Sequence, residues 1–144
     1  MDREALKAQL VIDEAKRNRL YKDSVDKWTI GVGHNIEDKG LSDTVISIIL
    51  DEDIDEKVAL LDKYLPWWRK MDEPRQNVLA NMAFNMGVGP SPEEPLGQLL
   101  TFRRTLVAME TGNYAAAAAG MAASLWARQV GKRAERLIAV MSGE

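Results

Sequence analysis

The chain has 144 residues, enough for one hydrophobic core in a single domain of one or two lobes, but not for two independent domains. Hydrophobic residues make up 46% and charged residues 28% of the sequence, which excludes a disordered or membrane-embedded chain. The absence of cysteine excludes disulfides and thiolate metal sites. The net charge of −3 argues against general nucleic-acid binding, because domains with that function are usually basic.

Charge is unevenly distributed along the chain. Residues 96–141 carry six basic side chains against two acidic ones, so the acidic excess lies in the rest of the sequence. A basic half favours contact with an anionic polymer, although ordinary solvated helix faces explain the same pattern equally well. No apolar stretch approaches the roughly 18 residues of a membrane helix, and the N-terminus is charged and amphipathic rather than a signal peptide.

The first predicted element is a helix that begins after a capping residue, Asp2. Its apolar residues Leu6, Leu10 and Val11 recur at helical spacing. Glu14 lies one turn beyond Leu10 on the same stripe, near the end of the helix, so we expect its carboxyl group to be partly buried. Burial and the negative end of a helix both favour a protonated carboxyl, as a general acid requires.

A change of period predicts a β-hairpin over residues 20–33, with its turn at residues 24–26. Bulky and small residues alternate along its second strand, in the order Trp28, Thr29, Ile30, Gly31, Val32 and Gly33. The face that carries Thr29 and the two glycines is almost bare, so a polymer chain could lie close to the backbone there. Asp23 falls at the turn, where a carboxylate is well hydrated.

The remaining elements are predicted to be helices. A long helix begins at Ser42 and ends at Pro66, and another begins at Pro74 and ends at Gly87. A proline-rich loop at residues 90–97 precedes helices near 101–111 and 114–127 and a final amphipathic helix. The expected fold class is therefore α+β, mainly α, with one small hairpin.

Several motifs together resemble a known family. Glu14, Asp23 and Thr29 form the pattern E-x8-D-x5-T. Thr29 is also the first residue of the run TIGVGH (29–34). The later blocks FNMG (84–87), SLW (124–126) and GKRA (131–134) occur in the same order as in phage-type lysozymes of glycoside hydrolase family 24, the endolysin N-acetylmuramidases. The resemblance implies a single lysozyme domain over residues 1–144. Within this domain, the resemblance implies a hairpin lobe (about 14–41), a connecting long helix (42–65) and a helical lobe (66–144) across a cleft.

The resemblance also implies roles for individual residues. Glu14 corresponds to the general acid, while Asp23 and Thr29 correspond to the residues that hold the attacking water in an inverting mechanism. Inversion requires the two carboxyl groups to lie roughly 6.5–9.5 Å apart. Glycan contacts are expected at Gly31, Gly33, Phe84 and Asn85, and supporting contacts at Arg133, which would steady the acid, and at the pair of His34 and Asp53.

The implied substrate is the peptidoglycan glycan strand of bacteria, cleaved at the β-1,4 bond between N-acetylmuramic acid and N-acetylglucosamine without metal or organic cofactor. Such an enzyme is expected to be a monomer that is made in the host cytoplasm and reaches the wall through a holin-type membrane lesion during lysis. No nucleic-acid partner and no stable membrane insertion are expected.

Three alternatives remain open at this point. A single Glu, Asp or Thr in a loop is most often solvent-facing or a cap, and a lysozyme-like fold can persist as an inactive wall-binding or virion module. A lytic transglycosylase would use the same substrate with a different product. A helical nucleic-acid-binding regulator is disfavoured by the net acidity and by the glycine-rich hairpin.

Overall fold

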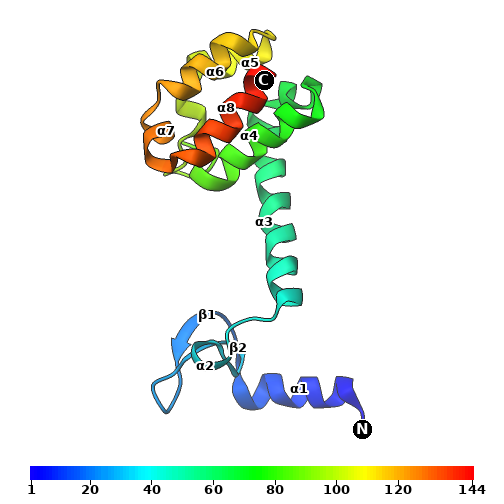
Figure 1. Ribbon diagram of the computed structural model, residues 1–144. Coiled ribbons are helices and arrows are strands. Elements are labelled where there is room, and N and C mark those ends of the chain that lie inside the picture. Colours follow the sequence, from blue (N-terminus) through cyan, green and yellow to red (C-terminus); the bar gives the residue numbers. More distant parts are fainter. The chain divides into compact units, whose positions relative to one another are not determined.

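The computed structural model describes all 144 residues (Figure 1). The chain forms two compact units, an N-terminal unit (Met1–Ile49) and a helical unit (Leu50–Glu144). The division between them falls inside the long helix α3 (Asp43–Tyr64). None of the helices has the length and apolar character needed to cross a membrane.

The N-terminal unit combines two helices with a small antiparallel sheet and the start of α3. Its elements are α1 (Arg3–Glu14), β1 (Lys16–Lys22), β2 (Trp28–Val32), β3 (His34–Asn35) and α2 (Ile36–Lys39). The strands lie in the order β1-β2-β3. The helix α1 begins as predicted, because the side chain of Asp2 accepts a hydrogen bond from the backbone N–H of Ala5.

The predicted hairpin is confirmed, but its second strand is shorter than the residue alternation indicated. In the pairing of β1 with β2, Tyr21 lies opposite Thr29 and Arg17 opposite Gly31. Gly31 and Gly33 both have positive φ, of 68° and 67°, which regular strand residues do not adopt. The chain therefore turns at Gly33 into β3 instead of continuing as one strand through residue 33.

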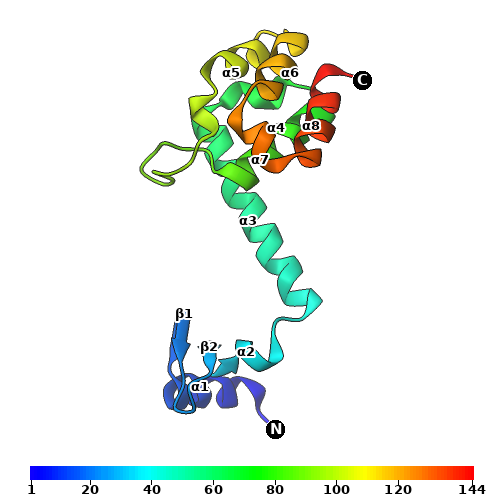
Figure 2. The ribbon, with the colours of Figure 1, turned by 60° about the vertical axis from the view of Figure 1, so that its left-hand side comes forward.

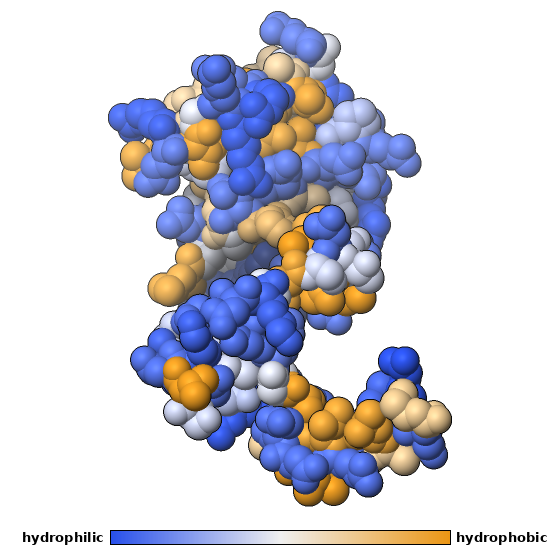
Figure 3. Space-filling view, turned by 60° about the horizontal axis from the view of Figure 1, so that its bottom comes forward, coloured by the Kyte–Doolittle hydropathy of each residue, from blue (hydrophilic) through white to orange (hydrophobic).

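Most apolar side chains of the N-terminal unit are exposed in this structure. The predicted apolar stripe of α1, formed by Leu6, Leu10 and Val11, lies open to solvent, and Figure 3 shows hydrophobic surface along this helix. Thr29 is the one residue of the unit that is buried. The unit is thus held together mainly by strand pairing and turn hydrogen bonds.

The helical unit contains the remainder of α3 and all later elements. These are the 3₁₀ helix η1 (Pro66–Lys70), α4 (Glu73–Met86), the 3₁₀ helix η2 (Leu99–Thr101), α5 (Arg103–Glu110), α6 (Tyr114–Ala122), α7 (Leu125–Val130) and α8 (Lys132–Ser142). The long helix and the helix that ends at Gly87 are confirmed within a residue or two. The predicted helix over 114–127 is wrong as a single element. Its chain leaves the helical path after Ala122, and the side chain of Ser124 caps α7 by accepting from the N–H of Ala127.

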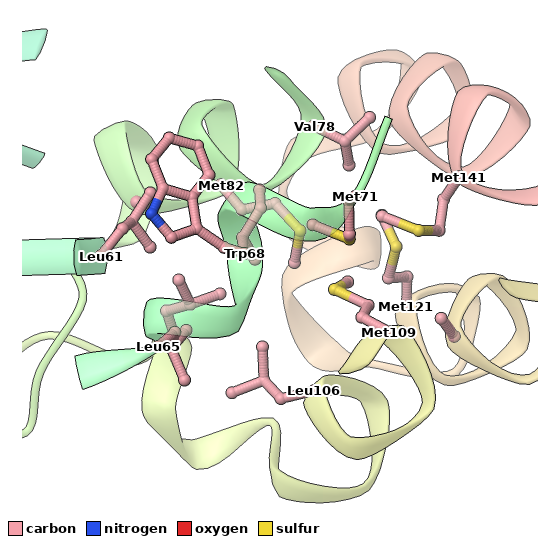
Figure 4. Close-up of a cluster of buried hydrophobic side chains, with 14 of the residues drawn as sticks. Leu61, Leu65, Trp68, Met71, Val78, Met82, Leu106, Met109, Met121 and Met141 are labelled. Atoms are coloured by element: carbon pink, nitrogen blue, oxygen red, sulfur yellow. The ribbon is translucent and has the colours of Figure 1, made fainter. Parts of the chain in front are cut away.

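Methionines fill much of the core of the helical unit. Five of them belong to the cluster of buried side chains that also contains Trp68 and Leu61, namely Met71, Met82, Met109, Met121 and Met141 (Figure 4). Methionine is unbranched and adapts to irregular gaps, which suits the junction of several short helices. Each such side chain stabilises the fold by roughly 1.5–3 kcal/mol relative to an exposed one. This core fixes the positions of α4, α5, α6 and α8.

A loop at residues 87–98 stands out from the helical unit between α4 and η2 (Figure 2). Two ion pairs attach it to α3, one between Lys57 and Glu94 and one between Lys63 and Glu93. The hydroxyl of Tyr64 also donates to Glu93 over 2.6 Å. The predicted proline-rich loop is therefore confirmed, and it is held by side chains of α3.

Candidate active site

Glu14 is the last residue of α1, and the chain turns sharply after it. Ala15 has a φ of 59°, a left-handed value that a non-glycine residue rarely adopts, and β1 begins at Lys16. This turn brings the Glu14 carboxylate against the backbone of Gly33, where a Cβ atom would lie 2.9 Å from Oε2. Glu14 is exposed, so the partial burial expected for it is not observed within the N-terminal unit.

Asp23 forms the hydrogen-bonded turn between β1 and β2. Its Oδ1 atom accepts from the backbone N–H groups of Val25 and Lys27, each over 2.9 Å. Its own carbonyl accepts from the N–H of Asp26 over 3.1 Å. Because both side-chain bonds go to Oδ1, Oδ2 remains free to accept a hydrogen bond from a water molecule.

Thr29 lies beneath this turn and is only 2% exposed. Its hydroxyl donates to the carbonyl of Lys27 over 2.9 Å. The same Lys27 residue donates its N–H to Asp23 and accepts the N–H of Asp23 over 3.0 Å. The backbone of Lys27 thus connects Asp23 to Thr29, and the Thr29 hydroxyl can act toward a further partner only as an acceptor.

The two glycines of the predicted glycan surface have different surroundings. A Cβ on Gly31 would meet no atom within 4 Å, so the backbone there is open to an approaching molecule. Gly33 instead leaves the space that the Glu14 carboxylate occupies. The bare surface expected on this strand is therefore present at Gly31, whereas the Thr29 residue is almost fully buried.

The other predicted substrate contacts belong to the helical unit, at the end of α4. Phe84 is 40% exposed and lines a cavity of about 390 Å³ together with Arg133. Asn85 accepts a hydrogen bond from the indole N–H of Trp126 over 2.9 Å. Trp126 itself is buried and belongs to the core, as expected. Asn85 thus has a structural partner in addition to its predicted role at the substrate.

The predicted supporting residues form hydrogen bonds within their own units. Arg133 donates to the side-chain oxygen of Asn81 through Nε and Nη2, over 2.9 and 2.7 Å. A ring nitrogen of His34 lies 2.7 Å from the carbonyl oxygen of Gly40. Asp53 lies in the part of α3 that belongs to the helical unit, half-buried. The pairing of Arg133 with Glu14 and of His34 with Asp53 stays a prediction.

Reasoning from the sequence missed three contributors to these arrangements. Lys27 acts through its peptide group and Ala15 through its backbone angle, and neither leaves a signature in the side-chain pattern. Asn81 lies one turn before Asn85 on α4, so the spacing of the two asparagines on one face of the helix was a usable signal. The structure contains no group of three or more His, Cys, Asp or Glu residues arranged to hold a metal ion.

Comparison with known proteins identifies the family. Residues 12–139 match the sequence model of the family described as phage lysozyme. A probable T4-type lysozyme 1 from Dictyostelium discoideum is 29% identical over 95% of this chain and 93% of its own length, and a probable T4-type lysozyme 2 from the same organism is 27% identical over 94% and 92%. The pre-baseplate central spike protein Gp5 of Enterobacteria phage T4 is 27% identical over 90% of this chain, which corresponds to 26% of the spike protein. The chain belongs to the phage lysozyme family and is a glycoside hydrolase that degrades peptidoglycan.

Proposed function

We propose that the enzyme hydrolyses the β-1,4 bond between N-acetylmuramic acid and N-acetylglucosamine with inversion at the anomeric carbon. Glu14 donates a proton to the leaving sugar oxygen. Asp23 accepts a proton from a water molecule that attacks from the opposite face of the sugar, and the Thr29 hydroxyl oxygen accepts the second hydrogen bond of that water. The proton lost by Glu14 is thereby balanced by the proton that Asp23 gains.

The hydrogen bonding of Asp23 is the observation that carries this proposal. A general base has to be held in place without losing its accepting oxygen. The turn meets both demands, because two backbone N–H groups hold Oδ1 while Oδ2 stays free. The opening at Gly31, without a side chain, further supports a sugar chain close to the backbone of β2.

Digestion of purified peptidoglycan by the wild type, Glu14→Gln and Asp23→Asn tests the reaction. Each catalytic variant has a matched control that removes the same charge nearby, Asp13→Asn on α1 and Asp26→Asn in the hairpin turn. Products ending in reducing N-acetylmuramic acid, released by the wild type and both controls but not by Glu14→Gln or Asp23→Asn, support the proposal. Equal loss of activity in a catalytic variant and its control would overturn the assigned role.

The same digests separate hydrolysis from transglycosylation. A transglycosylase needs no attacking water and leaves anhydro-muramic products, which differ in mass from the hydrolysed ones by one water molecule. If those products predominate, the roles of Asp23 and Thr29 proposed here are wrong. The anomeric configuration of freshly released sugar, followed by NMR before it equilibrates, reports inversion directly.

For the biological setting, we propose lysis of a bacterial host from within, by an enzyme that accumulates in the cytoplasm and acts on the wall after a holin-type lesion. The wide match to the phage lysozyme family supports this setting. Expression in a bacterium should leave the cells intact until the membrane is permeabilised, and Glu14→Gln should abolish the lysis that follows. Lysis without permeabilisation would contradict the holin requirement.

A virion-borne role is a second candidate, favoured by one comparison. The match to the spike protein Gp5 shows that a region similar to this chain occurs within a much longer phage protein. Fractionation of particles from a phage or prophage that carries this sequence distinguishes the two settings. A virion component is retained in purified particles, whereas a free lysis enzyme remains in the soluble lysate.

A further inference from the structure

The hairpin places a further charged side chain, that of Arg17, beside the open backbone at Gly31. Arg17 on β1 lies directly opposite Gly31 on β2. Two directly opposed residues of an antiparallel pair project from the same face of the sheet. A Cβ atom at Gly31 would meet no atom of another residue within 4 Å, neighbours in the chain aside. The Arg17 side chain therefore borders this opening without filling it.

A bulge in β1 makes Arg17 a neighbour of Tyr21. The pair of Arg17 with Gly31 and the pair of Tyr21 with Thr29 are four residues apart on β1 but only two residues apart on β2. Two residues of a regular strand span roughly 7 Å, whereas four span roughly 13 Å. Bulges of this kind redirect side chains and are frequent next to active sites. Arg17 and Tyr21 thus lie close together on the face that carries Thr29 and Gly31.

The guanidinium group of Arg17 is held by an aromatic ring and has no hydrogen-bond acceptor in the protein. Its Cζ atom lies 4.5 Å from the centre of the Tyr21 ring. Arg17 is exposed, and its side chain makes no ion pair and no hydrogen bond within the chain. Stacking orients the planar group, while its N–H donors point outward around the edge of the plane. All of these donors are free for a ligand.

The side chains of the first segment follow the small residues of β2 in order. The opposed positions are Glu14 against Gly33, Arg17 opposite Gly31, and Tyr21 opposite Thr29. A sugar chain that lies along the backbone at Gly31 and reaches the proposed acid runs beside Arg17. An exposed arginine is ordinarily a solvated surface residue, so it is this position, together with the stacking, that indicates a role at the substrate.

The chemistry of a guanidinium group at this position favours a carbonyl oxygen of the sugar. N-acetylglucosamine and N-acetylmuramic acid each carry an acetamido group. A hydrogen bond from a charged donor to its carbonyl oxygen is stronger than one between neutral groups. A free amino group at the same carbon lacks the acceptor, and in its protonated form it is repelled by the guanidinium group. Arg17 can therefore distinguish an acetylated sugar from a deacetylated one.

We propose that Arg17 binds the glycan strand over Gly31 by donating to an acetamido carbonyl, and that it selects N-acetylated over N-deacetylated peptidoglycan. The inference rests on the proposed function in taking the backbone at Gly31 as the surface along which the glycan lies. Tyr21 holds the guanidinium group in the orientation that this contact requires. Arg17 acts in substrate binding and has no part in proton transfer.

Lys22 provides a matched control on the opposite face of the hairpin. It follows Tyr21 directly, so its side chain projects from the other face of β1. Its Nζ atom lies 4.3 Å from the centre of the Trp28 ring, and Trp28 is its partner on β2. Arg17→Gln and Lys22→Gln thus each remove one positive charge and one contact between a cation and an aromatic ring from the same strand.

Binding of two small fragments to the full chain tests the assignment. The first is N-acetylglucosamine linked to N-acetylmuramic acid with its stem peptide, and the second carries free amino groups in place of both acetamido groups. NMR titrations followed at the backbone N–H of Gly31 give the dissociation constants. We expect the wild type to bind the acetylated fragment about tenfold more tightly than the deacetylated one. Arg17→Gln should bind both with nearly equal, weak affinity, and Lys22→Gln should keep the preference of the wild type.

Three results would each overturn the inference. The first is equal binding of the two fragments to the wild type. The second is an equal effect of Arg17→Gln and Lys22→Gln on binding of the acetylated fragment. The third is binding that leaves the Gly31 signal unchanged, because the glycan would then lie elsewhere.

Fragment binding and strand cleavage separate this inference from the proposed function. The fragment lacks the bond that the proposed reaction cleaves, so its binding is independent of catalysis. On soluble, uncross-linked strands, Arg17→Gln should raise KM about tenfold with little change in kcat. Binding of the fragment that depends on Arg17, by a chain that cleaves no strand, would overturn only the cleavage proposal. Cleavage with the same KM for Arg17→Gln and the wild type would overturn only the role of Arg17.

Discussion

The carboxylate of Glu14 lies in the space that a side chain at position 33 would need. A Cβ atom added to Gly33 would lie 2.9 Å from the Oε2 atom of Glu14. Glu14 and Gly33 are 19 positions apart in the sequence, and the turn at Ala15 together with the positive φ of Gly33 brings them into contact. Within the N-terminal unit, the proposed acid is therefore positioned by a backbone surface.

Replacement of Gly33 by alanine should reduce activity more than it reduces stability. The positive φ of 67° should cost about 1–2 kcal/mol of unfolding free energy for a residue with a Cβ. The methyl group should also displace the flexible Glu14 carboxylate, lowering kcat by about tenfold or more. Gly112→Ala is the matched control, because Gly112 has a φ of 78° and no atom within 4 Å of its Cβ position. Denaturant unfolding and wall digestion of both variants provide the comparison, and equal kcat values would show that Gly33 does not position the acid.

Replacement of Thr29 by valine tests the connection through Lys27. Valine keeps the shape but removes the hydroxyl that donates to the Lys27 carbonyl, at a cost of about 1 kcal/mol. We expect a larger loss of activity than this cost implies, since the water would lose one acceptor and the Asp23 turn one support. Thr29→Ser retains the hydroxyl and should keep most of the activity. If serine and valine variants are equally impaired, packing of the threonine methyl group, and not its hydroxyl, is what matters.

The sequence predicted the helices better than the details of the site, and the difference has a physical cause. Apolar spacing and caps such as Asp2 and Ser42 are local, so α1 and α3 were predicted closely. The break between α6 and α7 was missed because the alanine-rich run before Ser124 and the helix-favouring residues Leu125, Ala127 and Arg128 after it all favour a continuous helix. The spacing of Glu14, Asp23 and Thr29 is visible in the sequence. The hydrogen bonds of Asp23 and Thr29, however, are made with peptide groups, which every residue has, so no side-chain pattern predicts them.

The hydrogen bond between Trp126 and Asn85 should contribute to stability independently of any substrate. Trp126 is 4% exposed, so Asn85→Ala leaves its indole N–H buried without a partner, at a cost of about 1–3 kcal/mol. Trp126→Phe removes the donor, and Asn85→Ala should then cost much less in that background. A double-mutant cycle by urea unfolding measures the coupling. A coupling near zero would mean that water replaces Asn85 as the acceptor.

The loop at residues 87–98 should make the helical unit sensitive to acid. Burial alone would raise the pKa of Glu94, but the hydrogen bonds from Lys57 and from the N–H of Val88 outweigh it and lower this pKa below its ordinary value of 4.5. Hydrogen bonds from Lys63 and Tyr64 lower the pKa of Glu93 to about 2.

Because both folded-state pKa values are lowered, the stability that these carboxylates contribute is fully present at neutral pH. It is lost as the pH falls from about 4.5 toward 2. Glu94→Gln should therefore lower the unfolding free energy by about 1–3 kcal/mol at pH 7, between the values typical of exposed and buried pairs. The difference in unfolding free energy between Glu94→Gln and the wild type should shrink as the pH falls from about 4.5 toward 2. Glu93→Gln removes an exposed partner and should have a small effect at pH 7. Urea midpoints measured from pH 2 to pH 7 test both expectations, and a constant difference between Glu94→Gln and the wild type at every pH would show that the ion pair is not the cause.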